Sequence, residues 1–221
     1  MTSLPDPGST ARTRVRRIPE KAVTEREVAY AILDAGLMAH VAVVTDDQPY
    51  VVPVGYARRG DEVIFHGSSA SRLFRTLAGG VPTCLTVTLL DGLVLARSLF
   101  ESSMHYRCVM ALGRCRALDG DEEIEALLDL SESLMPGRTA DARHPAPQEL
   151  KATITLALPL DEISVKVGNR PPEDLDEDLV DPVYSTIWAG WVPITESFGA
   201  PVADDLAADV PLPDYVREWR R

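Results

Sequence analysis

The sequence predicts a mainly β protein, an antiparallel barrel that is closed or nearly closed and has helices at its flanks. Three observations support this fold class. Six or seven apolar, β-branched runs succeed one another, with turn signals at short spacing between them. Helical patterns are few and do not alternate regularly with the strands, as they would in βαβ units. No G-x-G-x-x-G motif follows a strand, which argues against a Rossmann domain.

The composition is that of one globular domain. The chain has 221 residues, of which 45% are hydrophobic, and this length suffices to bury a core. Its net charge of −12 disfavours a duplex nucleic-acid partner, which would require a basic face. We see no long apolar span and no secretory signal, and the three cysteines form no C-x-x-C motif. We therefore expect a cytoplasmic protein without membrane or nucleic-acid partners.

The first half of the chain predicts a helix, three strands and a second helix. Apolar residues recur with helical spacing over residues 20–36, where Gly36 is a stop signal. Residues 37–67 contain three β-branched runs divided by turn signals at 46–49 and 59–61, and they predict an antiparallel meander. The next short helix is expected to end at Gly79-Gly80.

The second half predicts further strands around one helix. Asp91-Gly92, flanked by Val, Thr and Leu on both sides, predicts a β-hairpin within residues 81–98. The remaining elements are expected as a strand at 105–113, a helix at 121–135, one long strand at 152–168, an acidic solvated loop at 170–182 and an aromatic return to the core at 187–194.

The stretch IFHGSSASRLFRTL, residues 64–77, is a candidate ligand site. A strand ends at His66, and hydroxyl and guanidinium groups gather at the start of the next helix: Ser68, Ser69, Ser71, Arg72 and Arg75. Unpaired N–H groups at a helix start, hydroxyl donors and a guanidinium fork together form a phosphate cradle. A serine N-cap with arginines in water has the same pattern, so both interpretations stay open.

Other reactive side chains give weaker indications. Arg107, inside a strand, requires an acidic or phosphate partner if it is buried, and otherwise lies at a solvated edge. Cys108 lacks a Cys-His-Asn signature and is expected to be a packed thiol rather than a nucleophile. The four histidines have no metal-site spacing, so no metal is predicted. His66 is expected to form a wall of a ligand site, and Trp188 either packs in the core or stacks on a flat ligand.

The order of five segments resembles that of the pyridoxamine 5′-phosphate oxidase-like family of FMN-binding split β-barrels, closest to the nitroimidazole-resistance (Nim-type) branch. The segments are RRIPEKA, PYVVPVGYARRGDEVIFHGSSASRLFRTL, HYRCVMALGRC, ATITLALPLDEISVKVG and WAGWVPI. The resemblance covers about residues 15–195, which would form a split barrel of six or seven strands. Residues 1–14 would then be a flexible N-terminal arm and residues 196–221 a C-terminal extension.

The resemblance implies a homodimer with FMN in a cleft between the subunits. The cofactor-binding residues that it implies are Val52, Pro53, Val54, Phe65, His66, Ser69, Ser71, Arg72, Cys108 and Trp188. In this assignment Ser71 and Arg72, with Ser69, hold the phosphate, and Cys108 contacts the flavin from the partner chain. Cys108 departs from the family pattern, because a serine usually follows the Tyr-Arg pair. Arg72 also departs from it, because a lysine is common in its neighbourhood.

The function implied is that of an FMN-dependent oxidoreductase, which would pass electrons from a reduced nicotinamide to a small nitroaromatic or quinone-like acceptor. A second interpretation is a protein that binds or senses a flavin or haem without turnover. A third is a deazaflavin-dependent reductase of the same fold. Because the cofactor itself carries the hydride and electron chemistry, no catalytic side chain is predicted.

Overall fold

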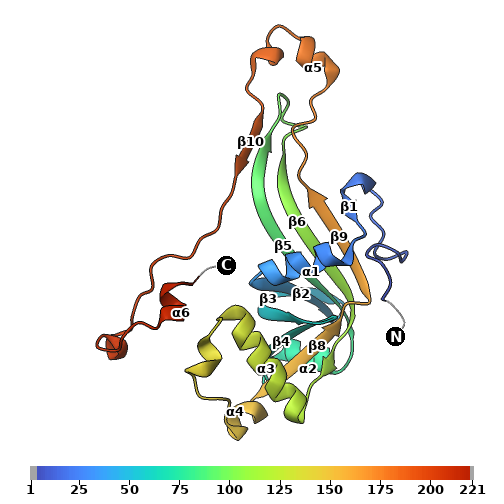
Figure 1. Ribbon diagram of the computed structural model, residues 1–221. Helices are drawn as coiled ribbons and strands as arrows, with labels where there is room; N and C mark the ends of the chain where they lie inside the picture. Colours follow the sequence, from blue (N-terminus) through green and yellow to red (C-terminus); the bar gives the residue numbers. More distant parts are fainter. Residues whose placement is uncertain (1–3, 220–221) are drawn as a thin grey trace.

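A single antiparallel sheet of ten strands forms the centre of the molecule, and the computed structural model describes residues 4–219 (Figure 1). The strands are β1 (Ala22–Val23), β2 (Met38–Thr45), β3 (Gln48–Arg59), β4 (Glu62–Ser68), β5 (Pro82–Leu95), β6 (Ser103–Arg114), β7 (Arg116–Ala117), β8 (Thr153–Pro159), β9 (Glu162–Gly168) and β10 (Gly190–Pro193). They pair in the order β1-β9-β6-β5-β2-β3-β4-β8-β7, and β10 adds to β5. The two ends of this path do not pair with each other, so the barrel is split rather than closed. The mainly β, split-barrel class is confirmed.

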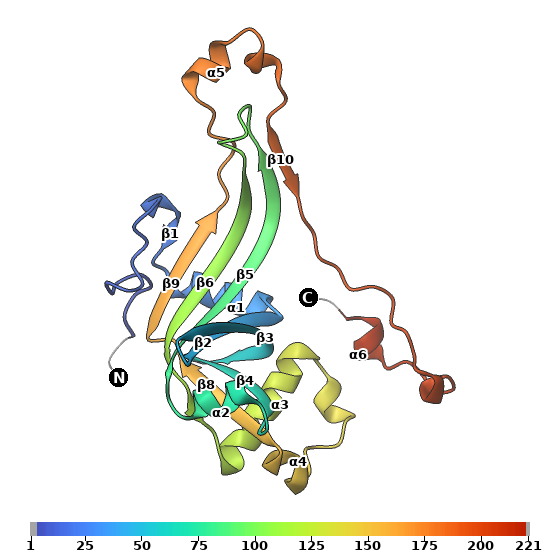
Figure 2. The same cartoon turned by 180° about the vertical axis from the view of Figure 1, so that it is seen from behind.

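Six α-helices lie around the sheet in the described part of the chain. They are α1 (Arg26–Ala35), α2 (Arg72–Ala78), α3 (Gly120–Leu134), α4 (Pro147–Lys151), α5 (Asp176–Val180) and α6 (Asp214–Arg217). Helices α3 and α4 lie at one end of the molecule beside β4 and β8, whereas α5 lies beyond the tip of the long β5–β6 hairpin (Figures 1 and 2). Helix α1 starts later than residue 20, because residues 22–23 pair with β9 instead. No helix within residues 4–219 has the length and apolarity needed to cross a membrane.

Side chains alternate along the central strands, and the inward row forms the main core. Val41, Tyr56, Phe65, Leu85 and Val109 are almost fully buried in it, and α1 and α2 contribute Ile32 and Leu77. A smaller cluster lies on the opposite face of β3, β4 and β8, under α3: Ala57, Ile64, Leu118, Ala126, Leu130 and Ala157. Helix α3 therefore covers the outer face at one end of the barrel only.

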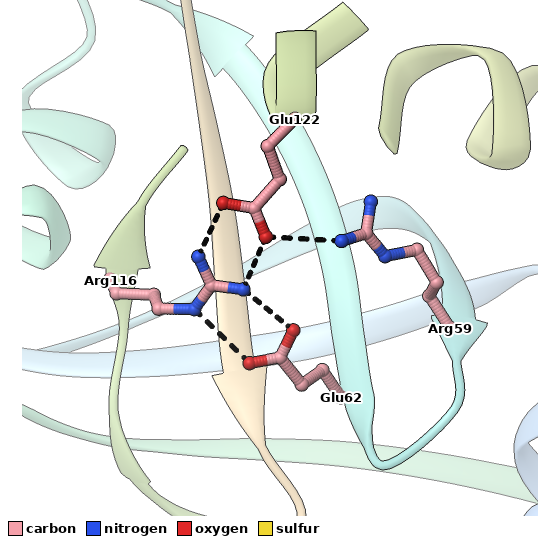
Figure 3. A network of polar contacts seen from close by, with 4 residues as sticks. All are labelled: Arg59, Glu62, Arg116 and Glu122. Carbon is pink, nitrogen blue, oxygen red and sulfur yellow. Dashed lines mark hydrogen bonds and ion pairs between the residues drawn. The ribbon is translucent and has the colours of Figure 1, made fainter. Parts of the chain in front are cut away.

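A network of charged side chains holds the first turn of α3 against the sheet (Figure 3). Glu122 accepts hydrogen bonds from Arg116 at 2.7 and 2.9 Å and from Arg59 at 3.0 Å. Arg116 also binds Glu62 of β4 through two hydrogen bonds of 3.1 and 2.9 Å. The network pins the start of α3 to β3, β4 and β7, and it thereby orients the rest of the helix.

The prediction of a hairpin at Asp91-Gly92 is wrong, because β5 runs through these residues as one strand. Its register with β6 shifts between Leu90 and Gly92, so Asp91 is the extra residue of a β-bulge. The chain reverses in residues 96–102. Glycine is required at position 92 because β10 passes close by, and a Cβ atom there would lie 2.8 Å from the carbonyl oxygen of Val192.

Residues 152–168 form two strands, not the single long strand expected. Strand β8 pairs with β4, whereas β9 pairs with β6 on the other side of the barrel. The chain bends at Leu160 and Asp161, directly after Pro159, which has no N–H with which to extend a ladder. The two apolar runs thus serve different halves of the sheet.

The terminal segments also differ from expectation. Residues 4–14 dock on β9: Gly8 N donates to Ile163 O at 2.8 Å, and Arg12 pairs with Glu162. Thr13 is 2% exposed, so this segment is held on the sheet rather than free. At the other end, Trp188 and Trp191 are 65% and 52% exposed. The aromatic segment therefore pairs along β5 without returning to the core, which corrects the sequence-based expectation.

Candidate cofactor site

A cleft of about 620 Å³ opens beside His66, at the end of the barrel that α3 covers. Its walls come from β4, β8, α3, α4 and the loop between the two helices. The lining residues are His66, Leu127, Ser131, Arg138, Asp141, Ala142, Arg143, Pro145, Glu149, Leu150 and Thr153. This volume is within the usual range for sites that hold a drug-sized molecule or a cofactor.

His66 presents a neutral imidazole to this cleft. Burial among its neighbours lowers the pKa of His66 below its ordinary value of 6.5, because the surroundings disfavour the charged form. Within residues 4–219 the ring makes no hydrogen bond or ion pair with another side chain or the backbone. A neutral, unpaired ring nitrogen that faces a cleft can ligate a metal or accept a hydrogen bond.

The rim of the cleft carries two arginines with different partners. Arg143 pairs with Glu149 through hydrogen bonds of 2.8 and 2.5 Å, and this pairing lowers the pKa of Glu149 to about 2. Arg138 donates to the hydroxyl of Tyr215 at 3.1 Å and makes no ion pair in the described chain, and its pKa is raised mainly by Tyr215 and more weakly by Asp141. The cleft thus combines apolar side chains with two arginines and two carboxylates, Asp141 and Glu149, and Arg138 is the cation among them that could receive a carboxylate of a ligand.

A second region is the uncovered outer face of the sheet. The register places His40 opposite both Pro53 and Thr86, and Thr86 opposite Met110, so these side chains form one row. Cys108 lies in the next row, opposite Thr88, whose hydroxyl is 3.5 Å from its sulfur. Of the predicted ring-contact residues, Pro53 and Cys108 therefore share this face.

Three of the other predicted residues point into the core. Val52 and Val54 alternate with Pro53 and face inward, so only their backbone borders the outer face. Phe65 is 0% exposed, and its ring lies 5.9 Å from that of Phe74. The Phe65 side chain therefore cannot contact a cofactor without disrupting the core, although its neighbour His66 faces outward.

The predicted phosphate residues do lie together at the start of α2. Ser71 occupies the N-cap position, but its hydroxyl caps no backbone N–H of the helix. The Arg72 guanidinium lies 4.3 Å from the centre of the Tyr50 ring and has no carboxylate partner in the described chain. Ser69 is tied to the segment before β8, since its N–H donates to Ala152 O at 2.8 Å. The assignment of these residues to a phosphate stays a prediction.

Trp188 is not near these residues within one chain. It precedes β10, which pairs with residues 92–95 at the far end of β5. His40 pairs with Thr86 of the same strand, and the strand between Thr86 and Val94 spans about 26 Å at 3.3 Å per residue. A single subunit therefore cannot bring Trp188 next to His40 or Pro53.

The His66 cleft and the outer face adjoin. Tyr56 pairs with Phe65, so Gly55 is next to His66 on the neighbouring strand, and Gly55 pairs with Met38 of β2. Leu134, at the end of α3, lies 3.4 Å from where a Cβ of Gly55 would be. Only two strand spacings, about 10 Å, separate β4 from β2, so ligands in the two regions would lie close together.

Sequence reasoning missed the walls of the cleft. Leu127 and Ser131 belong to a helix that periodicity predicts, but nothing local shows that this helix lies over His66. Arg138 and Arg143 belong to a loop rich in Pro and Arg, and this composition was the one feature of the sequence that could have indicated a binding surface there. No group of three or more His, Cys, Asp or Glu side chains that could hold a bare metal ion occurs in residues 4–219.

Comparisons with known proteins show the family. The family model described as pyridoxamine 5′-phosphate oxidase matches residues 25–167. The FAD- and haem-binding protein from Mycobacterium smegmatis is 42% identical, with 89% of this chain and 96% of that chain covered and a TM-score of 0.84. The flavocytochrome Anf3 from Azotobacter vinelandii is 38% identical, with 98% and 99% covered and a TM-score of 0.89.

A more distant structure shares the fold alone. It comes from Bacteroides thetaiotaomicron, is named for 5-nitroimidazole antibiotic resistance, and is 19% identical over 66% of this chain and 86% of that chain, with a TM-score of 0.57. No curated protein matches the chain in sequence. The fold, the family model and the identity across nearly the whole chain agree, and this protein belongs to the pyridoxamine 5′-phosphate oxidase family.

Proposed function

We propose that this protein binds both a flavin and a haem and serves as a redox protein. The observation that carries the proposal is the 42% and 38% identity, over 89% and 98% of this chain, to two structures named for FAD and haem binding and as a flavocytochrome. This likeness favours FAD over the FMN expected from the sequence. It also replaces the alternative between flavin and haem with a protein that holds both.

The haem is assigned to the cleft beside His66. A b-type haem needs an axial ligand, apolar walls for its macrocycle and cations for its two propionates. His66 would hold the iron through its neutral imidazole, Leu127 and Leu150 would pack on the macrocycle, and Arg138, which makes no ion pair in the described chain, would pair with a propionate. The residues present therefore fit the group, and a single histidine suffices because the porphyrin supplies the other ligands.

The flavin is assigned to the outer face and the start of α2. The row of His40, Pro53 and Thr86 lies on the outer face of neighbouring strands, where a ring system could lie along the sheet and find both apolar contacts and hydrogen-bonding groups. Ser71 and Arg72 offer a hydroxyl and a cation without a carboxylate partner for a phosphate. The negative net charge of the chain does not oppose this assignment, because the local potential decides anion binding.

These residues would bind and orient the cofactors. A flavin supplies hydride and electron transfer when bound, and a haem supplies one-electron chemistry. The proposed physiological role is electron transfer from a reduced nicotinamide to a small acceptor.

We also propose a homodimer. On the outer face of the sheet the apolar side chains of Met38, Val44 and Val51 are 54%, 61% and 62% exposed, and a second subunit could cover them.

The visible spectrum of freshly isolated protein tests the proposal. We expect the visible absorbance band of a flavin and the Soret band of a haem, each from one cofactor per chain, and extraction followed by mass measurement identifies the flavin. Anaerobic mixing with reduced nicotinamide should bleach the flavin band. A protein that contains flavin and takes up no haem from excess hemin would contradict the haem assignment. A colourless protein that binds neither added cofactor would contradict the whole proposal.

A further inference from the structure

We infer that residues 194–212 form a clasp that closes on a second copy of this chain, an inference that rests on the homodimer proposed above. This segment connects β10 to the loop before α6. In both views it runs away from the sheet and returns toward α3 and α4 only at its far end (Figures 1 and 2).

Both ends of the segment are fastened to its own chain. At the first end, β10 pairs with β5, and Ile194 N donates to Asp91 O at 2.9 Å. At the second end, the Tyr215 hydroxyl accepts a hydrogen bond from Arg138 at 3.1 Å. The Tyr215 ring also packs so closely on Gly137 that a Cβ there would lie 2.9 Å from it. The path of the segment is therefore defined at both ends.

Between these anchors, Phe198 packs edge-on against Trp219, but three other apolar side chains are largely exposed in the described chain. Val202, Leu206 and Val210 are 93%, 96% and 63% exposed. In the described chain, the backbone-to-backbone hydrogen bonds of residues 195–212 stay within the segment, and the Leu212 carbonyl accepts one bond from the Arg217 side chain. Ordering a backbone costs about 1–2 kcal/mol per residue, and exposed apolar side chains return none of it. Another surface must therefore cover this segment if it is to hold its path.

The charge pattern identifies a second copy as that surface. Residues 194–212 contain Glu196, Asp204, Asp205 and Asp209 and no lysine or arginine. The N-terminal segment of the same chain carries Arg14, Arg16 and Arg17, which have no carboxylate partner within residues 4–219. The N-terminal segment and the C-terminal segment lie on opposite sides of one molecule (Figure 1), so only a second copy can bring them together.

Dimer dissociation measured by sedimentation velocity tests the clasp. The paired substitution Val202→Asp and Leu206→Asp should weaken the dimer by about tenfold or more, because two covered apolar side chains become carboxylates. Leu206→Met keeps the apolar area and is the matched control, with an unchanged dissociation constant expected. Hydrogen exchange of wild-type residues 195–212 should slow when the protein is concentrated above the dimer dissociation constant, whereas exchange of β8 should not change.

The outcomes separate the clasp from the dimer. A wild-type dimer that tolerates both aspartates without loss, and whose residues 195–212 exchange freely, overturns the clasp and leaves the dimer standing. A wild-type chain that stays monomeric at every concentration overturns the proposed dimer, and the clasp with it.

Discussion

Asp91 and Arg107 face each other across β5 and β6 and form a two-point ion pair. Arg107 Nε donates to Asp91 Oδ2 at 2.9 Å, and Arg107 Nη2 donates to Asp91 Oδ1 at 2.7 Å. The pairing raises the pKa of Arg107 above its ordinary value. The Asp91 carbonyl also accepts from Ile194, so one bulged residue joins β5, β6 and the strand that carries the C-terminal segment.

Removing this pair should loosen the long hairpin. Asp91→Ala is expected to lower the free energy of unfolding by about 1 kcal/mol, because the pair is bidentate but more than one third exposed to solvent. Chemical denaturation of Asp91→Ala, Arg107→Ala and the double variant measures the coupling. If the two single losses simply add in the double variant, the pair contributes nothing of its own.

His66→Ala should abolish the Soret band and leave the flavin band in place. The proposed haem loses its axial ligand, whereas the outer face of the sheet is not altered. His144→Ala is the matched control, because His144 is exposed in the loop beside the cleft and does not line it. In His66→Gly, added imidazole should restore the Soret band, since the smaller side chain leaves room for it. Full haem content in His66→Ala would contradict the assignment.

The free energy of unfolding of the cofactor-free protein should fall as the pH is lowered through 6.5, the ordinary pKa of a histidine such as His66. The folded protein holds the pKa of His66 below that value, so near pH 6 the unfolded chain binds more protons than the native state does. Protonation therefore favours unfolding, and the stability that neutral His66 provides is present at high pH and lost at low pH. Thermal unfolding at about pH 7.5 and about pH 5.5 should show a smaller difference for His66→Gln than for the wild type. Equal differences would contradict this prediction.

Arg72→Ala should weaken flavin binding by about 1.5–3 kcal/mol, the range for a lost hydrogen bond to a charged group. Its exposed guanidinium should matter little for folding. Arg75→Ala, on the same helix, is the matched control, because Arg75 is exposed and belongs to the last turn rather than the first. Fluorescence titration of apoprotein with flavin measures both variants. Equal losses of flavin affinity in Arg72→Ala and Arg75→Ala would contradict the assignment of the phosphate to Arg72.

Arg116→Met should release the first turn of α3 from the sheet. Arg116 binds both Glu62 and Glu122 but is 44% exposed, so the expected loss of unfolding free energy is about 1 kcal/mol. Because α3 forms a wall of the His66 cleft, haem affinity should fall as well, whereas flavin affinity should not. Urea denaturation and hemin titration measure the two effects, and unchanged hemin affinity would show that α3 keeps its place without the network.

The sequence by itself determined the strand runs of the central sheet, because the alternation of apolar residues is a local property of an extended chain. It did not determine which way their side chains point: Val52, Val54 and Phe65, assigned to the cofactor from the sequence, face the core. The same local reasoning brought Ser71 and Arg72 together, since a strand end and a helix start are adjacent along the chain.

Only the tertiary structure decided what depends on distant neighbours. Asp91-Gly92 has the sequence of a turn, but pairing with β6 and β10 on either side makes it a bulge within a strand. The cleft beside His66 is formed by α3 and the loop that follows, more than fifty residues away in the chain. These outcomes rest on packing between segments far apart in the chain, and no local pattern of residues contains that information.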